Sequence, residues 1–172
     1  MPTNKATAMM LKKLFFIVVI FIPCVVQAQS PPFDTIDRDA VEIGGAITYG
    51  DSVNDLTSAF GDPENIRDYY LEMDKKTEVQ YIYADGSEFR FIDDNLHSFK
   101  IASSNYVLSL GEAELQVGDS MTSVASSFPN SHSYMDNDAT AMIIGLGAGD
   151  HDFLLVVFDA EDTVSEIRQR IF

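Results

Sequence analysis

The chain has 172 residues, with 11 basic against 27 acidic side chains and a formal net charge of −16. Such a charge leaves no basic patch, which argues against nucleic acid and anionic membrane surfaces as partners. Its single cysteine, Cys24, lies in an apolar N-terminal run, so the remainder of the chain has no disulfide, thiolate metal site or cysteine nucleophile.

Residues 1–28 predict a cleaved secretory signal. Three lysines precede an apolar run over residues 14–26, and Val26-Gln27-Ala28 places small residues at a cleavage site. The run is shorter than the roughly 20 residues of a transmembrane helix, which is the alternative reading. We therefore expect a periplasmic or secreted protein with no stable membrane insertion after cleavage.

Cys24 leaves a second localisation open, a lipid anchor in the membrane, because a lipid can be attached to a cysteine near such a signal. A lipoprotein signal has a small residue directly before its cysteine, whereas Pro23 stands there and apolar Val25 follows. A lipid anchor at Cys24 is thus a disfavoured alternative.

The mature chain contains an internal repeat. Residues 47–62 (ITYGDSVNDLTSAFGD) and 115–130 (LQVGDSMTSVASSFPN) share five identities at an offset of 68 residues, and 96–100 matches 164–168 at the same offset. This spacing predicts a tandem duplication. We expect an acidic N-terminal segment at 29–42, a first unit at 43–110 and a second unit at 111–172, within one domain or two small ones.

Each unit is expected to begin with a short helix. Ser52 and Asp55 form a capping-box pattern, and Val53, Leu56 and Phe60 share one helical face. Gly61 ends the first helix, and a matching helix follows Ser120. Helices this short need to pack on a sheet.

Antiparallel strands are expected after the first helix, with a two-residue turn at Asp85-Gly86. That turn pairs Tyr83 with Glu88 and Tyr81 with Arg90 on one face, and Ile82 with Phe89 on the other. The next turn sets Phe89 opposite Phe99 and Glu88 opposite Lys100. In the second unit the same register sets Leu155 opposite Ile167 and Leu154 opposite Arg168.

The expected fold class is therefore α+β. Each unit is a short helix packed on a four-stranded antiparallel meander, with one sheet face open. By this register the open face collects Asp68, Tyr70, Glu72, Tyr81, Tyr83, Glu88, Arg90 and Lys100. Tyrosines on an open sheet face favour partner binding, although cross-strand tyrosine pairs can also serve only to stabilise a solvated face.

The tandem organisation, the Gly50-Asp51-Ser52 and Gly118-Asp119-Ser120 helix starts and the Phe60-Gly61-Asp62-Pro63 helix end resemble the β-lactamase inhibitor protein fold. Outer-membrane assembly lipoproteins use a single copy of a related unit. The resemblance covers roughly residues 43–172 and implies binding of a protein by a curved sheet face. This chain lacks that family's cysteines and has Pro129 in place of the second helix-ending glycine, so no inhibitory residue carries over.

No motif predicts catalysis or a metal site. The histidines (His97, His132 and His151) lack zinc-ligand spacing, and no GxSxG or phosphate-binding glycine loop occurs. The clusters around Asp136 and Asp150 favour turns over calcium sites. We therefore expect no catalytic residues, metal or cofactor.

Together these patterns predict an exported, non-enzymatic, inhibitor-like module that binds a protein partner through Tyr70, Tyr81, Tyr83, Glu88 and Arg90. The alternatives are a small extracytoplasmic hydrolase that uses acidic residues and an envelope assembly or scaffold lipoprotein.

Overall fold

The computed structural model describes residues 32–72, 75–135, 139–147 and 152–171. The predicted signal and Cys24 lie outside these residues. None of the helices in the described ranges is long and apolar enough to cross a membrane.

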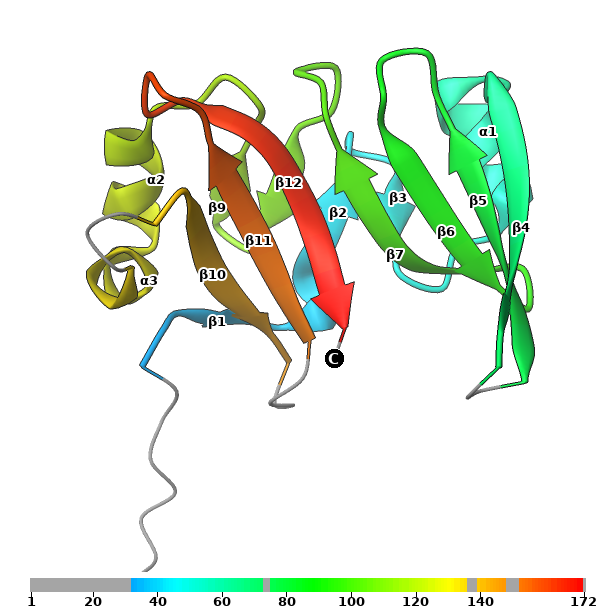
Figure 1. The fold of residues 1–172 in the computed structure, drawn as a ribbon, viewed down its shortest axis with the longest axis horizontal. Helices are drawn as coiled ribbons and strands as arrows, with labels where there is room; N and C mark the ends of the chain where they lie inside the picture. Colours follow the sequence, from blue (N-terminus) through cyan, green and yellow to red (C-terminus); the bar gives the residue numbers. More distant parts are fainter. Residues whose placement is uncertain (1–31, 73–74, 136–138, 148–151, 172) are drawn as a thin grey trace, which may run out of the picture.

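Most of the strands form one eight-stranded sheet, in the order β1-β10-β11-β12-β7-β6-β5-β4 (Figure 1). Its strands are β1 (Thr35–Ile36), β10 (Ala141–Leu146), β11 (Asp152–Phe158), β12 (Val164–Ile171), β7 (Asn95–Ile101), β6 (Glu88–Ile92), β5 (Lys76–Ile82) and β4 (Asn65–Leu71). All neighbours are antiparallel except β1 and β10. The α+β class is thus confirmed.

Strands before the first meander (β4–β7) and strands between it and the second meander (β10–β12) form a second, four-stranded sheet, in the order β3-β2-β8-β9. These strands are β2 (Val41–Ile43), β3 (Ile47–Thr48), β8 (Leu108–Leu110) and β9 (Ala113–Leu115). The expected acidic segment at 29–42 contains β1, the 3-10 helix η1 (Arg38–Ala40) and the start of β2. The N-terminal segment therefore contributes strands to both sheets.

The described part of the chain also has three α-helices: α1 (Val53–Phe60), α2 (Met121–Ser127) and α3 (Pro129–Tyr134). Ser52 caps α1 in the predicted capping box with Asp55, and Ser120 caps α2. The helices are anchored by their buried sides, with Leu56 and Val124 in the core.

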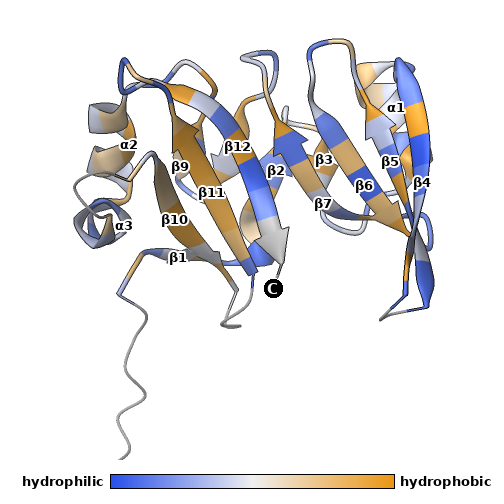
Figure 2. Cartoon of the chain, viewed as in Figure 1, coloured by the Kyte–Doolittle hydropathy of each residue, from blue (hydrophilic) through white to orange (hydrophobic). Residues whose placement is uncertain are grey.

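A single core lies between the two sheets. It joins Phe89, Phe99 and Ile144 of the large sheet to Ile43 and Leu108 of the small one. We call the side of the large sheet that faces this core the covered face and the opposite side the open face. Apolar and polar residues alternate along β6 and, apart from one irregularity, along β7, as expected for strands with one solvated face (Figure 2).

The predicted β5–β6 register is wrong by one residue. The amide of Gly86 donates to the carbonyl of Tyr83 (3.0 Å) and the amide of Tyr83 to the carbonyl of Ser87 (2.9 Å). The turn is therefore a three-residue loop with Gly86 at φ +85°, a conformation that suits glycine. Tyr81 now pairs with Phe89, because a one-residue slip moves every side chain of the strand to the other face.

The β6–β7 register, with Glu88 opposite Lys100 and Phe89 opposite Phe99, is confirmed. In the second half, Leu155 lies opposite Arg168, so the expected pairing of Leu155 with Ile167 is wrong by one residue.

The expected four-stranded meander of the second unit is also wrong, since the described strands there are β10, β11 and β12. Pro129 begins a further helix, α3, where the first unit has its strand β4, because proline is tolerated in the first turn of a helix. α3 packs against β10, and the two residues of β1 pair with the end of that strand. A helix and a short strand thus replace the missing strand.

Candidate functional site

A polar cleft opens on the open face where the two meanders meet. In the described residues β7 and β12 pair only at Ile101–Ile167 and Lys100–Arg168. Beside this short ladder lies a cleft of about 440 Å³, which we call the seam cleft. Its lining residues are Glu88, Arg90, Phe99, Lys100, Glu166, Arg168 and Gln169.

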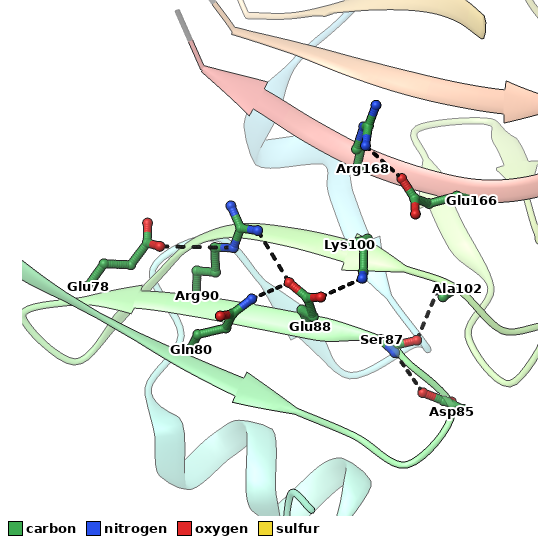
Figure 3. A network of polar contacts seen from close by, with 10 residues as sticks. All are labelled: Glu78, Gln80, Asp85, Ser87, Glu88, Arg90, Lys100, Ala102, Glu166 and Arg168. Atoms are coloured by element: carbon green, nitrogen blue, oxygen red, sulfur yellow. Dashed lines mark hydrogen bonds and ion pairs between the residues drawn. The ribbon is translucent and has the colours of Figure 1, made fainter. Parts of the chain in front are cut away.

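Glu88 is the centre of the charge network on the wall of the cleft (Figure 3). Its carboxylate accepts hydrogen bonds from the ammonium of Lys100, the guanidinium of Arg90 (3.2 Å) and the side-chain amide of Gln80. The Nε atom of Arg90 also lies 3.9 Å from the carboxylate of Glu78. We call the β7–β12 junction the seam. On its β12 side, Arg168 pairs with Glu166 of the same strand at 3.1 Å. The rim of the cleft therefore presents fixed charges of both signs.

Partial burial alone would raise the pKa of Glu88, but the hydrogen bonds and charges of Lys100 and Arg90 outweigh it. They hold the pKa below its ordinary value of 4.5. A carboxyl whose pKa is lowered on folding stabilises the fold above its unfolded pKa, and this contribution is lost as the pH falls through the folded value.

We predict that Glu88→Gln lowers the free energy of unfolding by about 1 kcal/mol at pH 7, because two cations lose their anionic acceptor at a partly solvated site. The deficit should shrink as the pH falls through the lowered pKa of Glu88, because the wild-type carboxyl then becomes protonated as well. Urea denaturation from pH 3 to 8 measures both. As a control, Asp93→Asn removes the exposed Lys76–Asp93 pair (2.9 Å) and should change little at any pH. A deficit for Glu88→Gln that did not shrink with falling pH would contradict this account.

The floor of the cleft is formed by Phe99 and Gln169, which come from the covered-face side of their strands. Gln169 is 6% exposed, and its amide nitrogen donates to Asp152 Oδ1 at 2.7 Å. Its Oε1 atom is buried and has no hydrogen-bond partner among the described residues. An unsatisfied buried acceptor costs free energy, so this position lowers the stability of the fold locally.

Behind the floor, Arg38 joins the N-terminal segment to both meanders. Its guanidinium pairs with Asp152 (3.2 Å), donates to the carbonyl of His97 (3.0 Å) and lies 4.2 Å from the centre of the Tyr49 ring. Burial first, and then the negative charge of Asp152, raise the pKa of Tyr49 well above its ordinary range against the opposing charge of Arg38. Tyr49 therefore stays protonated beneath the cleft.

The structure places two of the five predicted site residues, Glu88 and Arg90, at the seam cleft, with Lys100 beside them. The expectation that Tyr81 and Tyr83 lie on the open face is wrong. Both lie on the covered face, where Tyr83 is 7% exposed and its hydroxyl donates to the carbonyl of Gly61 at 3.0 Å. Burial raises the pKa of Tyr83 to about 12.

Tyr70 is 64% exposed, but it lies on the covered-face side of the edge strand β4, far along the sheet order from the seam. Asp68 shares that side, because it pairs with Val79, which pairs with the core residue Phe91. The predicted placement of both residues on the open face is therefore wrong, for the same reason of register.

Sequence reasoning missed the floor of the cleft and one wall, which comprise Phe99, Glu166, Arg168 and Gln169. A signal for Arg168 was present, since the repeat aligns it with Lys100 at the offset of 68 residues. No local pattern marks Gln169, because its role depends on Asp152, which is 17 residues away and on another strand.

Within the described ranges, no group of three or more potential metal-ligating side chains converges. The acidic residues Asp136, Asp138 and Asp150, together with His151, lie outside those ranges.

Comparison with known proteins gives no family-model match and no match among curated proteins. One solved structure with detectable similarity is an extracellular protein containing a SCP domain from Bacillus anthracis str. Ames. It shares 12% sequence identity at a TM-score of 0.43, over 71% of this chain and 43% of the other.

Proposed function

We propose that this protein is an exported, non-enzymatic binding module that docks a protein partner on the open face of its large sheet, centred on the seam cleft. The observation that carries the proposal is the cleft itself, because it gathers charged side chains of both signs (Glu88, Arg90, Lys100, Glu166 and Arg168) at one place on the open face. Fixed charges of both signs would pair with complementary charged groups of a partner. The N-terminal signal pattern supports export.

The surface beside the cleft favours a protein over a small molecule. Arg168 pairs with Leu155, and Leu155 pairs with Ile143, so one cross-strand row continues from the charged rim into aliphatic residues. Leu155, Ile143 and Val157 are only half-buried. A polar centre beside an apolar surface is a pattern that protein interfaces use.

Hydrolysis by paired carboxylates is the competing function, and the seam cleft supports it less well. A general acid needs a carboxyl whose pKa is raised toward neutrality. Lys100 and Arg90 act on Glu88 in the opposite sense and keep its pKa low. Because these cations keep Glu88 ionised, its side chain is suited to recognising charged groups of a partner.

The tandem duplication is part of this proposal, and hydrogen bonds at the two helix starts support it. The amide of Gly50 donates to the carbonyl of Leu96 (3.1 Å), and 68 residues further on the amide of Gly118 donates to the carbonyl of Val164 (2.8 Å). The resemblance to β-lactamase inhibitor proteins remains a proposal on the same footing.

The seam adds support of its own, because Lys100 and Arg168 are equivalent positions of the proposed repeat and lie directly opposite each other. When two units are related by a two-fold axis, an antiparallel ladder between them pairs equivalent positions with each other at the axis. The proposed binding site would therefore lie on an internal two-fold axis.

Site-specific photo-crosslinking in the producing cell tests the docking face. A photoreactive residue at Leu155 should give one discrete adduct, which is lost when Arg168→Glu is added and retained with Lys75→Glu, an exposed charge reversal away from the cleft. An adduct that survives Arg168→Glu, or no adduct at all, would rule out docking at the seam.

A further inference from the structure

The edge strand β4 differs from every other sheet edge in the described structure. β1, β3 and β9 are edges of two or three residues, whereas β4 has seven. Short edges protect a sheet from unwanted pairing, and a long edge presents a row of free backbone donors and acceptors. In the described sheet β4 is the last strand, and β5 is its one paired neighbour.

β4 also carries most of the exposed large apolar side chains of the described residues. Ile66 is 54% exposed, Tyr69 45% and Tyr70 64%. The register places Ile66, Asp68 and Tyr70 on one side of the strand and Arg67 and Tyr69 on the other. One side therefore has the order apolar, acidic, apolar, and neither proline nor a bulge interrupts the strand.

We propose that β4 binds an extended segment of a different protein as an added antiparallel strand. Backbone hydrogen bonds would supply affinity, and side chains on alternate positions would supply specificity. The complementary segment has apolar residues opposite Ile66 and Tyr70 and a Lys or Arg opposite Asp68, a sign that suits a chain of net charge −16. This proposal is independent of docking at the seam.

A second copy of this chain fits β4 less well. Two-fold antiparallel pairing keeps opposite residues on the same face, so it joins residues whose numbers are both even or both odd. The register that pairs Ile66 with Tyr70 of the second copy also sets Asp68 opposite Asp68. Like charges directly opposite destabilise a pair, and the two copies repel each other overall.

The probe for the test is a synthetic peptide, TVTKEVT, designed to lie antiparallel with its lysine opposite Asp68. NMR titration of the mature protein should give saturable shift changes in the amides of β4 within about 1 mM peptide. N-methylation of alternate peptide residues should abolish binding for one of the two possible sets and spare it for the other, because only one edge of the peptide faces β4.

Matched variants separate side-chain recognition from a general effect. Asp68→Lys should weaken binding of TVTKEVT by about fivefold. The same variant should bind the charge-swapped peptide TVTEEVT more tightly than it binds TVTKEVT. Ile66→Thr with Tyr70→Thr should abolish binding, whereas Arg168→Glu at the seam should leave it unchanged. The proposal would be overturned if binding did not saturate, if the shifts were confined to the seam cleft, or if the two N-methylated sets had equal effects. A stable dimer of the free protein in sedimentation would also overturn it.

Discussion

Replacing Tyr83 by alanine is expected to lower the free energy of unfolding by about 3–5 kcal/mol, as is usual for a large aromatic side chain in a core. The ring of Tyr83 lies 5.6 Å from that of Phe89 in an edge-to-face arrangement, and Phe89 in turn contacts Tyr106 and Phe60. Truncation would leave a cavity in this aromatic cluster and remove the hydrogen bond to Gly61. Urea denaturation at pH 7 with an unchanged m-value would measure the loss.

Two tyrosine variants serve as controls for that measurement. Tyr83→Phe keeps the ring and loses only the hydrogen bond to the carbonyl of Gly61, so about 1 kcal/mol is expected. Tyr70→Ala removes an exposed ring and should cost less than about 0.5 kcal/mol. If Tyr83→Ala cost no more than Tyr70→Ala, Tyr83 would lie on a solvated face and the β5–β6 register would be wrong.

The helix starts could be predicted from the sequence because their determinants are local. Ser52 and Asp55 bond to each other's backbone within one turn, and the apolar spacing of Leu56 selects the buried side. The hairpin at Asp85-Gly86 was also found, but its loop length was not. Asp-Gly fits both a two-residue turn and a three-residue loop with glycine in the left-handed conformation.

That single ambiguity decided the predicted binding site. In the three-residue loop Asp85 accepts a hydrogen bond from the amide of Ser87 (2.9 Å), and Ser87 Oγ accepts one from the amide of Ala102 (3.1 Å). The second of these contacts joins the residue before β6 to the residue after β7. Because side chains alternate along a strand, the one-residue difference moved Tyr81 and Tyr83 onto the covered face.

The seam could not be predicted because it is made by distant parts of the chain. Arg38 and Asp152 are 114 residues apart, and they meet behind the cleft only after both meanders have joined. No period or motif within one strand specifies which edge of the first meander meets the second. Glu88 and Arg90 were found because the β6 strand and its pairing with β7 are local.

The join between the meanders gives the second large expected effect. Ile101 and Ile167 are fully buried and lie opposite each other in the short β7–β12 ladder. Replacing either by alanine should lower the free energy of unfolding by about 2–5 kcal/mol, because each leaves a cavity where the two halves of the sheet meet. The single variants are measured by urea denaturation.

The double variant then tests the pairing itself. Because opposite side chains share one cavity, the loss for Ile101→Ala with Ile167→Ala should fall short of the sum of the single losses by about 0.5–3 kcal/mol. Val124→Ala, in the core on α2, pairs with neither strand and should combine additively with Ile101→Ala. Additive losses for the isoleucine pair would mean that the two side chains do not meet. In that case the continuous eight-stranded sheet, and with it the open face that carries the proposed site, would have to be redrawn.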